Sequence, residues 1–203
     1  MTRISPTPAK PGSEQEALFR QCRERLGFVP MTLRVMARKP ELLTAWFALI
    51  KEVYLKPSEV PTPLKRLIAH AISRVAECPY SMAHTAEAAA QAGVPLEKIK
   101  AVFECETDPQ FSGAERAALA VARSAGAIPN AVNDDHFELL RAHFSDDQIL
   151  EIVAVISLFG FLNRWQSTLA LTLEEEPRAF AEQNITEIGW ALGRHGGDDV
   201  EPR

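Results

Sequence analysis

The stretch SRVAECPYSMAHTAEAAAQAGVPLEKIKAVFE, residues 73–104, decides the fold of this chain. It is rich in alanine, and the pair Cys78-Pro79 interrupts an otherwise helical pattern. Proline inside a helix removes a hydrogen-bond donor and clashes with the preceding turn, so one helix should end before Cys78 and another begin at Pro79. Gly93 should end that second helix. The sequence therefore predicts that Cys78 is the N-cap of a helix reaching to about residue 92.

The rest of the chain is also predicted to be helical, because its apolar residues recur at helical spacing and no strand pattern competes. Ser13 with Glu16, and Ser112 with Glu115, have the spacing of capping boxes at helix starts. The expected helices cover residues 13–26, 40–54, 62–77, 79–92, 95–103, a segment from 112, 134–143 and 145–173. The fold class predicted from this pattern is all-α.

Composition limits the possible partners. The chain has 203 residues and a formal net charge of -5 with mixed signs, which gives no basic surface for nucleic acid or for an anionic membrane. Its N-terminus has no secretory signal, and its three cysteines are too few for a disulfide framework. We therefore expect a cytoplasmic protein with reduced thiols that acts on a small molecule.

One domain is expected, over residues 13–190. The residues 1–12 contain three prolines and are predicted to be a flexible arm, and residues 191–203 a frayed tail. The longest apolar run, Ile152–Leu162, is shorter than the roughly 18 residues of a membrane span. It is therefore predicted to be a buried helix segment.

The segment around Cys78 is a candidate reactive site. Free N–H groups and the helix dipole at an N-cap stabilise a thiolate, which lowers the pKa of a thiol there. His84 follows Tyr80 by four residues and Ser81 by three, so its ring can reach either hydroxyl, whereas a direct contact with Cys78 along one helix is not expected. The alternative is that Cys78 is a small buried residue and His84 a satisfied one. One thiol and one imidazole are too few ligands for zinc, so no metal and no cofactor are expected.

The same stretch resembles the core of the carboxymuconolactone decarboxylase family, in its alkylhydroperoxidase D-like, peroxidase-related branch. In that branch a Cys-x-x-Cys pair precedes a histidine at a helix start. The resemblance extends to residues 29–54, to FSGAERAALAVARS at 111–124 and to residues 144–171 with Asn163-Arg164. It implies an all-helical alkylhydroperoxidase D-like bundle that assembles as a homo-oligomer, a dimer or larger.

This chain departs from the family pattern at two positions. Ser81 stands where relatives carry the second cysteine, and serine forms neither a sulfenic acid nor a disulfide. Arg66 stands where relatives carry a glutamate that relays protons. With His70 and Arg74 it forms a polar column on one helix face. This column either binds a substrate carboxylate or helps to lower the pKa of Cys78, or else it is a solvated basic face with Glu77 balancing Arg74.

Three functional hypotheses follow. The first is a peroxidase-related enzyme, in which Cys78 reduces a hydroperoxide and an external thiol completes the cycle. The second is a degenerate homologue that serves as an oligomeric binding or scaffold protein, and the third is non-redox chemistry on a carboxylated small molecule. The candidate catalytic residues are Cys78, Tyr80, Ser81 and His84, and the candidate substrate-binding residues are Arg66 and His70.

Overall fold

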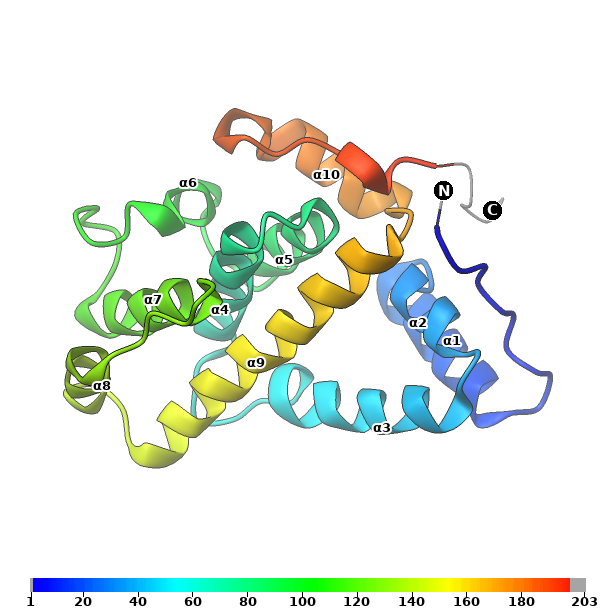
Figure 1. Ribbon diagram of the computed structural model, residues 1–203, viewed down its shortest axis with the longest axis horizontal. Coiled ribbons are helices and arrows are strands. Elements are labelled where there is room, and N and C mark those ends of the chain that lie inside the picture. The colour runs from blue at the N-terminus through cyan, green and yellow to red at the C-terminus, as the bar shows by residue number, and fades with distance from the viewer. Residues whose placement is uncertain (1, 198–203) are drawn as a thin grey trace.

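The computed structural model describes residues 2–197, which fold into helices joined by short loops and contain no strand (Figure 1). The predicted all-α class is confirmed. In chain order the α-helices are α1 (Glu14–Leu26), α2 (Met31–Met36), α3 (Pro40–Ile50), α4 (Thr62–Val75), α5 (Pro79–Gln91), α6 (Leu96–Lys100), α7 (Gly113–Gly126), α8 (Asp134–Arg141), α9 (Asp146–Leu169) and α10 (Glu175–Asn184). A π-helical turn, Lys51–Leu55, extends α3.

Most predicted helix starts are confirmed, and two helices were missed. Ser112 forms a complete capping box with Glu115, as the spacing predicts, and Ser145 forms another with Gln148. The short helix α2 was missed because five of its six residues are buried, which leaves no amphipathic pattern. Helix α10 was not predicted, although the acidic residues in its first turn favour a helix N-terminus. Helix α9 ends four residues earlier than predicted, since Ala170 takes a left-handed conformation with φ 47.

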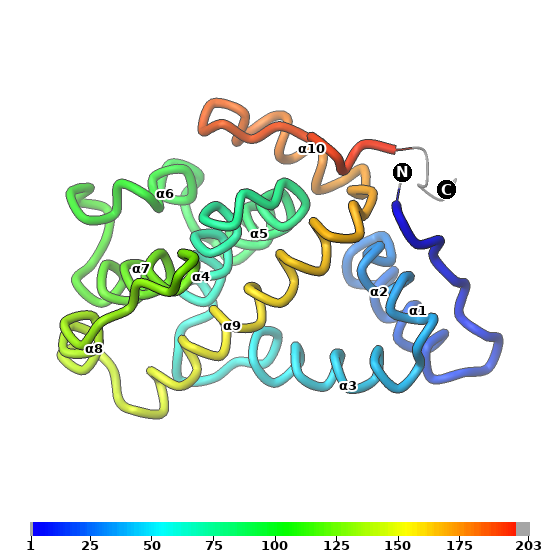
Figure 2. The backbone as a smooth tube through the Cα atoms, in the orientation of Figure 1, coloured from blue at the N-terminus to red at the C-terminus, as the bar shows by residue number. Residues whose placement is uncertain are grey.

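Helix α4 lies at the centre and packs against α5, α7 and α9 (Figure 2). Every residue from Leu64 to Ser73 is buried, so the predicted solvated basic face of this helix is wrong. Arg74 is also not balanced by a carboxylate at residue 77. Its Nη1 donates to the carbonyl of Lys100 at 2.7 Å, and its guanidinium lies 4.0 Å from the ring centre of Phe103.

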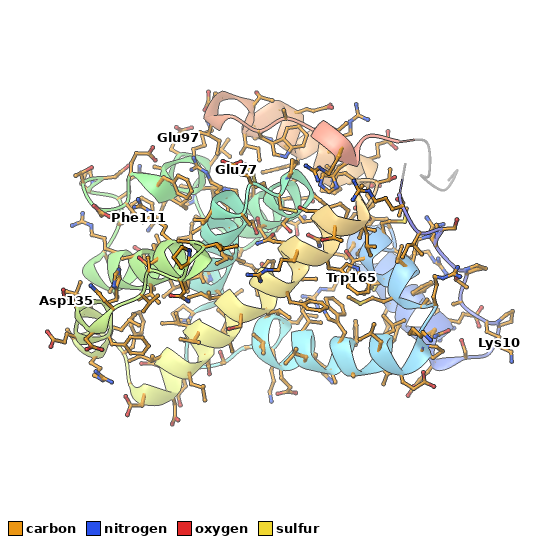
Figure 3. All side chains as sticks on the ribbon, viewed as in Figure 1. Lys10, Glu77, Glu97, Phe111, Asp135 and Trp165 are labelled. Atoms are coloured by element: carbon orange, nitrogen blue, oxygen red, sulfur yellow. The ribbon has the colours of Figure 1, made fainter. Side chains whose placement is uncertain are left out.

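The turn between α4 and α5 is short and fully hydrogen-bonded. Cys78 N–H donates to the carbonyl of Ser73 at 3.2 Å, and Glu77 N–H donates to that of Arg74 at 3.0 Å. These two bonds form a Schellman motif, in which Glu77, with φ 46, takes the left-handed position that glycine usually occupies. Glu77 stands at this junction in Figure 3. Cys78 is the N-cap of α5, as predicted.

The two ends of the described chain are attached to the end of α9. In the N-terminal arm, which has no helix, Arg3 N–H donates to the carbonyl of Leu169 at 2.8 Å, and Thr7 N–H to that of Arg34 at 3.1 Å. The flexibility of the arm stays a prediction. His195 is fully buried and accepts from Leu173 N–H at 2.9 Å, so a frayed tail is left only for residues 198–203, which lie outside the described residues.

Helix α9 is long and apolar enough to cross a membrane, but 44% of its apolar window is buried within the protein. It packs against α4, α5 and α7, which is the behaviour of a core helix in a helical domain. The expectation that Ile152–Leu162 is a buried helix segment holds for most of the run, but Phe161 within it is 41% exposed. Leu150, two residues before the run, is 68% exposed on the same outward stripe of the helix. Val153 and Gly160 line an apolar groove of about 880 Å³ beside this stripe, between α9, α4 and α7.

We expect a second copy of the chain to cover this stripe, because exposed large apolar side chains on one helix face mark an interface. Sedimentation velocity should give a mass that is a multiple of 22.4 kDa at micromolar concentration. Phe161→Asp should shift the protein toward the monomer. Leu49→Asp, at a 52% exposed position on α3, is the control and should not. A wild-type mass of 22.4 kDa would contradict the prediction.

Candidate functional site

A cavity of about 580 Å³ lies between the N-terminal helices and the start of α5. Helices α4 and α9 complete its walls. Its lining combines a set of aromatic rings with a set of polar groups. The aromatic residues are Phe28, Trp46, Phe47, Tyr54, Tyr80 and Phe159, and the polar ones include Thr32, Arg66, Ser81, His84 and Gln166. Such a mixture suits a small ring with a few polar atoms.

Ser81 and Cys78 share a partner on α9 but differ in their access to the cavity. The Ser81 hydroxyl donates to Oε1 of Gln166, and Sγ of Cys78 lies 3.8 Å from the same oxygen. The Gln166 amide in turn donates to Oγ1 of Thr32 at 3.3 Å. Ser81 lines the cavity, whereas Cys78 is fully buried and does not. The thiol therefore lies behind the wall that Ser81 and Gln166 form.

The second group of polar contacts is centred on Glu174. The Tyr80 hydroxyl donates to Glu174 Oε1 at 2.7 Å, and His84 Nε2 lies 2.7 Å from Glu174 Oε2. The backbone N–H of Met31 also donates to this carboxylate. His84 therefore does not bond to Tyr80 or Ser81 as predicted. It stacks on the Tyr80 ring, with 4.6 Å between ring centres, and bonds to a residue 90 positions away.

These contacts assign proton positions at the site. A carboxylate only accepts hydrogen bonds, so the His84 proton that faces Glu174 is on Nε2 and Nδ1 is left for a ligand or water. Burial, followed by the neighbouring Glu174 charge, raises the pKa of Tyr80 well above its ordinary value. Tyr80 thus remains a protonated donor at neutral pH. The pair His84–Glu174 is the acid–base group of the cavity.

Three site residues were not found by sequence reasoning: Thr32, Gln166 and Glu174. Gln166 lies two positions after the Asn163-Arg164 pair, but nothing local distinguishes it from a surface glutamine. Glu174 is the first of three consecutive glutamates, for which no helix was predicted. It reaches the site because the left-handed Ala170 reverses the chain after α9, which makes Glu174 the N-cap of α10.

Of the two predicted substrate-binding residues, only Arg66 lines the cavity. Its guanidinium carbon lies 3.6 Å from the ring centre of Tyr54. His70 is fully buried outside the cavity, and its Nδ1 lies 3.1 Å from Oγ1 of Thr85. Thr85 Oγ1 donates to the carbonyl of Ser81 at 2.6 Å, so the His70 ring donates to Thr85 and ties α4 to α5. His70 is a structural residue here.

No three His, Cys, Asp or Glu side chains between residues 2 and 197 gather as a metal site would require. The arrangement that remains is a helix-capping cysteine, a histidine on the same helix, and a cavity closed by one long helix. This fold and site define an alkylhydroperoxidase D-like protein.

Comparison with known proteins gives the same result. Residues 40–124 match the model of the carboxymuconolactone decarboxylase family. The structure of the debrominase Bmp8 is similar, with 33% identity, a TM-score of 0.79, and 90% of this chain and 97% of that chain covered. A peroxidase-related protein from Silicibacter sp. TM1040 is 25% identical, with a TM-score of 0.75 over 83% of this chain and 90% of that one. YnjA of Escherichia coli, an uncharacterised protein, is 26% identical over 72% of this chain and 81% of its own length. The chain belongs to the carboxymuconolactone decarboxylase family.

The buried His70 should make stability depend on pH. Burial, followed by the charge of Arg74, lowers its pKa to about 3, whereas an unfolded histidine titrates at about 6.5. Between these values the unfolded state binds more protons, so the free energy of unfolding must fall as the pH falls from 6.5 toward 3. His70 alone should contribute a slope of about 1.4 kcal/mol per pH unit.

Denaturant unfolding of wild type and His70→Gln at several pH values between 4 and 7 measures this contribution. His195, whose pKa burial also lowers, is present in both proteins, so the difference between the two slopes isolates His70. Equal slopes would contradict the prediction, because they would mean that His70 binds the same number of protons in the folded and unfolded states.

Proposed function

We propose that this protein is a one-cysteine reductase that removes a halogen from a small aromatic ring, with Cys78 as the reacting thiol. The observation that carries the proposal is the aromatic cavity of about 580 Å³, whose polar lining of Ser81, His84 and Gln166 adjoins that thiol. The rings on its walls suit a flat ligand, and the acid–base pair His84–Glu174 can supply a proton to it.

Similarity to the debrominase supports this substrate class. The two chains share 33% identity over nearly the whole of both. A variant of Bmp8 in which alanine replaces a cysteine was solved in complex with 2,3,4-tribromopyrrole, again with 33% identity and a TM-score of 0.80. A brominated pyrrole is a small flat ring of the kind that the aromatic walls described above would accept.

The alternative nucleophile, Ser81, lacks activation. A serine attacks only when a neighbouring base takes its proton. The Ser81 hydroxyl donates to an amide oxygen of Gln166, and His84, the nearest candidate base on the same helix, is bonded to Glu174 instead. Acyl transfer through Ser81 is therefore not supported by this geometry, and a thiol remains the stronger nucleophile.

The proposed cycle balances with an external thiol as reductant. Nδ1 of His84 takes up the proton that the Cys78 thiol loses. The thiolate attacks the halogen, the carbon–halogen electron pair stays on the ring carbon, and that carbon takes the proton from Nδ1 of His84. The ring is reduced and the sulfur becomes a sulfenyl halide. One external thiol displaces halide to give a mixed disulfide, and a second releases Cys78 as a thiol. Two external thiols thus become one disulfide for each halide released.

Access to Cys78 is the step that the cavity alone does not provide. The thiol is fully buried, and the amide of Gln166 contacts both it and Ser81. The proposal therefore requires the Gln166 side chain to leave its bond to Ser81 when substrate enters. Its other contact, to Thr32 at 3.3 Å, is a long hydrogen bond between neutral groups, which costs little to break.

Replacing Cys78 tests the proposal. Wild type with 2,3,4-tribromopyrrole and dithiothreitol, without oxygen, should release bromide, which ion chromatography measures. Cys78→Ala should lower the rate by about 100-fold or more, because no other group replaces the nucleophile. Cys22→Ala is the matched control, since Cys22 also lines the cavity. Bromide release that survives in Cys78→Ala, or is absent from wild type, would contradict the proposal.

A second candidate is reduction of a hydroperoxide in antioxidant defence, favoured by the peroxidase-related members of the family. The same thiol would attack the distal peroxide oxygen, which gives an alcohol and a sulfenic acid on Cys78. One external thiol would convert the sulfenic acid to a mixed disulfide and water, and a second would restore the thiol.

Ser81→Cys tests how much of the peroxidase chemistry this scaffold retains. Cys78 Sγ and Ser81 Oγ contact the same amide oxygen, so a cysteine at residue 81 should form a disulfide with Cys78 on mild oxidation. The variant should then consume cumene hydroperoxide with a dithiol faster than wild type does. Adding Arg66→Glu restores the relay carboxylate of the relatives and should raise the rate further. If neither variant forms the disulfide, the site has lost the peroxidase geometry.

Two other hypotheses become outcomes of these assays. A protein that binds tribromopyrrole without turning over either substrate would be a ligand-binding or scaffold homologue. Chemistry on a carboxylated substrate that survives in Cys78→Ala would be non-redox. A cytoplasmic location is part of the main proposal, because the cycle consumes reduced thiols. A homo-oligomer is part of it as well, supported by the exposed apolar side chains of Leu150 and Phe161 on α9.

A further inference from the structure

Arg66 is a buried cation without a matching anion. Its side chain lies on α4 and is 7% exposed, and its Nη1 has no hydrogen-bond partner. Among residues 2–197, no carboxylate lies within ion-pair distance of it. Glu87, which lines the same cavity, makes no ion pair with it either. The neighbour that the guanidinium does have is the face of the Tyr54 ring, at 3.6 Å.

A buried guanidinium without an anion costs folding free energy unless a bound ligand supplies the anion. Arginine stays charged at every physiological pH, and a buried charge needs a paired or hydrogen-bonded partner. A cation over an aromatic ring recovers only part of this cost. Lys65, the neighbouring cation on α4, is satisfied by Glu151 at 3.4 Å and by the carbonyl of Val53 at 3.1 Å. Of these two neighbouring cations on α4, only Arg66, which lines the cavity, lacks a carboxylate partner.

We propose that Arg66 is an anion-binding residue of the cavity and that the natural ligand is an aromatic anion. The guanidinium would pair with the ligand's charge while the ring packs among Tyr54 and Phe159. This deepens the proposed function, on whose cavity it rests, because it assigns a charge to the substrate.

Two kinds of aromatic anion share this chemistry. One carries a carboxylate, which a guanidinium binds with two parallel hydrogen bonds. The other is a ring whose own N–H has ionised, as halogen substituents promote. Pyrrole-2-carboxylate represents the first and 2,3,4-tribromopyrrole the second. Pyrrole-2-carboxamide has nearly the same shape as the carboxylate without the charge.

Isothermal titration calorimetry in the Cys78→Ala background measures binding without turnover. The protein with Arg66 should bind pyrrole-2-carboxylate at least about tenfold more tightly than pyrrole-2-carboxamide, and Arg66→Gln should abolish this preference. Arg66→Lys, which keeps a charge but not the planar fork, should retain part of it. Arg178→Gln removes an exposed arginine paired with Glu182 on α10 and should change nothing.

The tribromopyrrole arm separates the two sources of charge. If the ring anion is the ligand, its binding should tighten as the pH rises through the ring N–H pKa, and Arg66→Gln should remove that dependence. Equal binding of carboxylate and carboxamide, together with pH-independent binding of tribromopyrrole, would overturn the inference. So would an unchanged preference in Arg66→Gln, provided that its melting curve shows a folded protein.

The outcomes also distinguish this inference from the proposed function. Anion binding that depends on Arg66, with no Cys78-dependent bromide release, would leave the anion site standing and remove the reductase. Bromide release that depends on Cys78, with no effect of Arg66 on anion binding, would support the reductase and remove the anion site.

Discussion

The turn between α4 and α5 is the feature on which the site depends. Ser73 and Arg74 carbonyls accept from Cys78 and Glu77, and the left-handed Glu77 lets the chain reverse direction within two residues. Pro79 then starts a new helix at once. Because ten of the fourteen residues of α4 are buried, this turn sets the position of α5 against the core. The capping cysteine, the serine and the histidine all take their places from it.

The other half of the site comes from far along the chain. Gln166 reaches the Cys78 and Ser81 side chains from α9, and Glu174 joins Tyr80, His84 and the Met31 backbone from the N-cap of α10. Each contact spans at least 85 residues, so they form only after α9 packs across α4 and α5. The polar lining of the cavity is a tertiary assembly, and removing either partner would leave buried polar groups unpaired.

The proposed function depends on two residues that line the cavity, Arg66 and Ser81. Ser81 cannot form a disulfide with Cys78, so an oxidised Cys78 cannot be reduced through a cysteine at residue 81. The proposed thiol cycle therefore uses an external thiol. Arg66 places a positive charge in the cavity wall, where the family resemblance implies a glutamate. Under the proposed function, Arg66 and Ser81 together would favour a negatively charged or weakly acidic ring, and the similarity to a debrominase supports that proposal.

Much of the fold was predictable because its signals are local. Capping boxes at Ser112 and Ser145, the proline at residue 79 and the helical spacing of apolar residues act within a few positions of the chain, so the all-α class and most helix starts could be found without coordinates. The N-cap role of Cys78 was found in the same way.

The sequence could not show which side chains are buried or which residues far apart in the chain form hydrogen bonds. His70 seemed a ligand contact and is a structural bond to Thr85, His84 bonds to Glu174, and Arg66 lies unpaired in the cavity wall. These contacts depend on which helix covers which face of its neighbours. The packing of the whole core decides this, and the residues adjacent in the chain carry no signal for it.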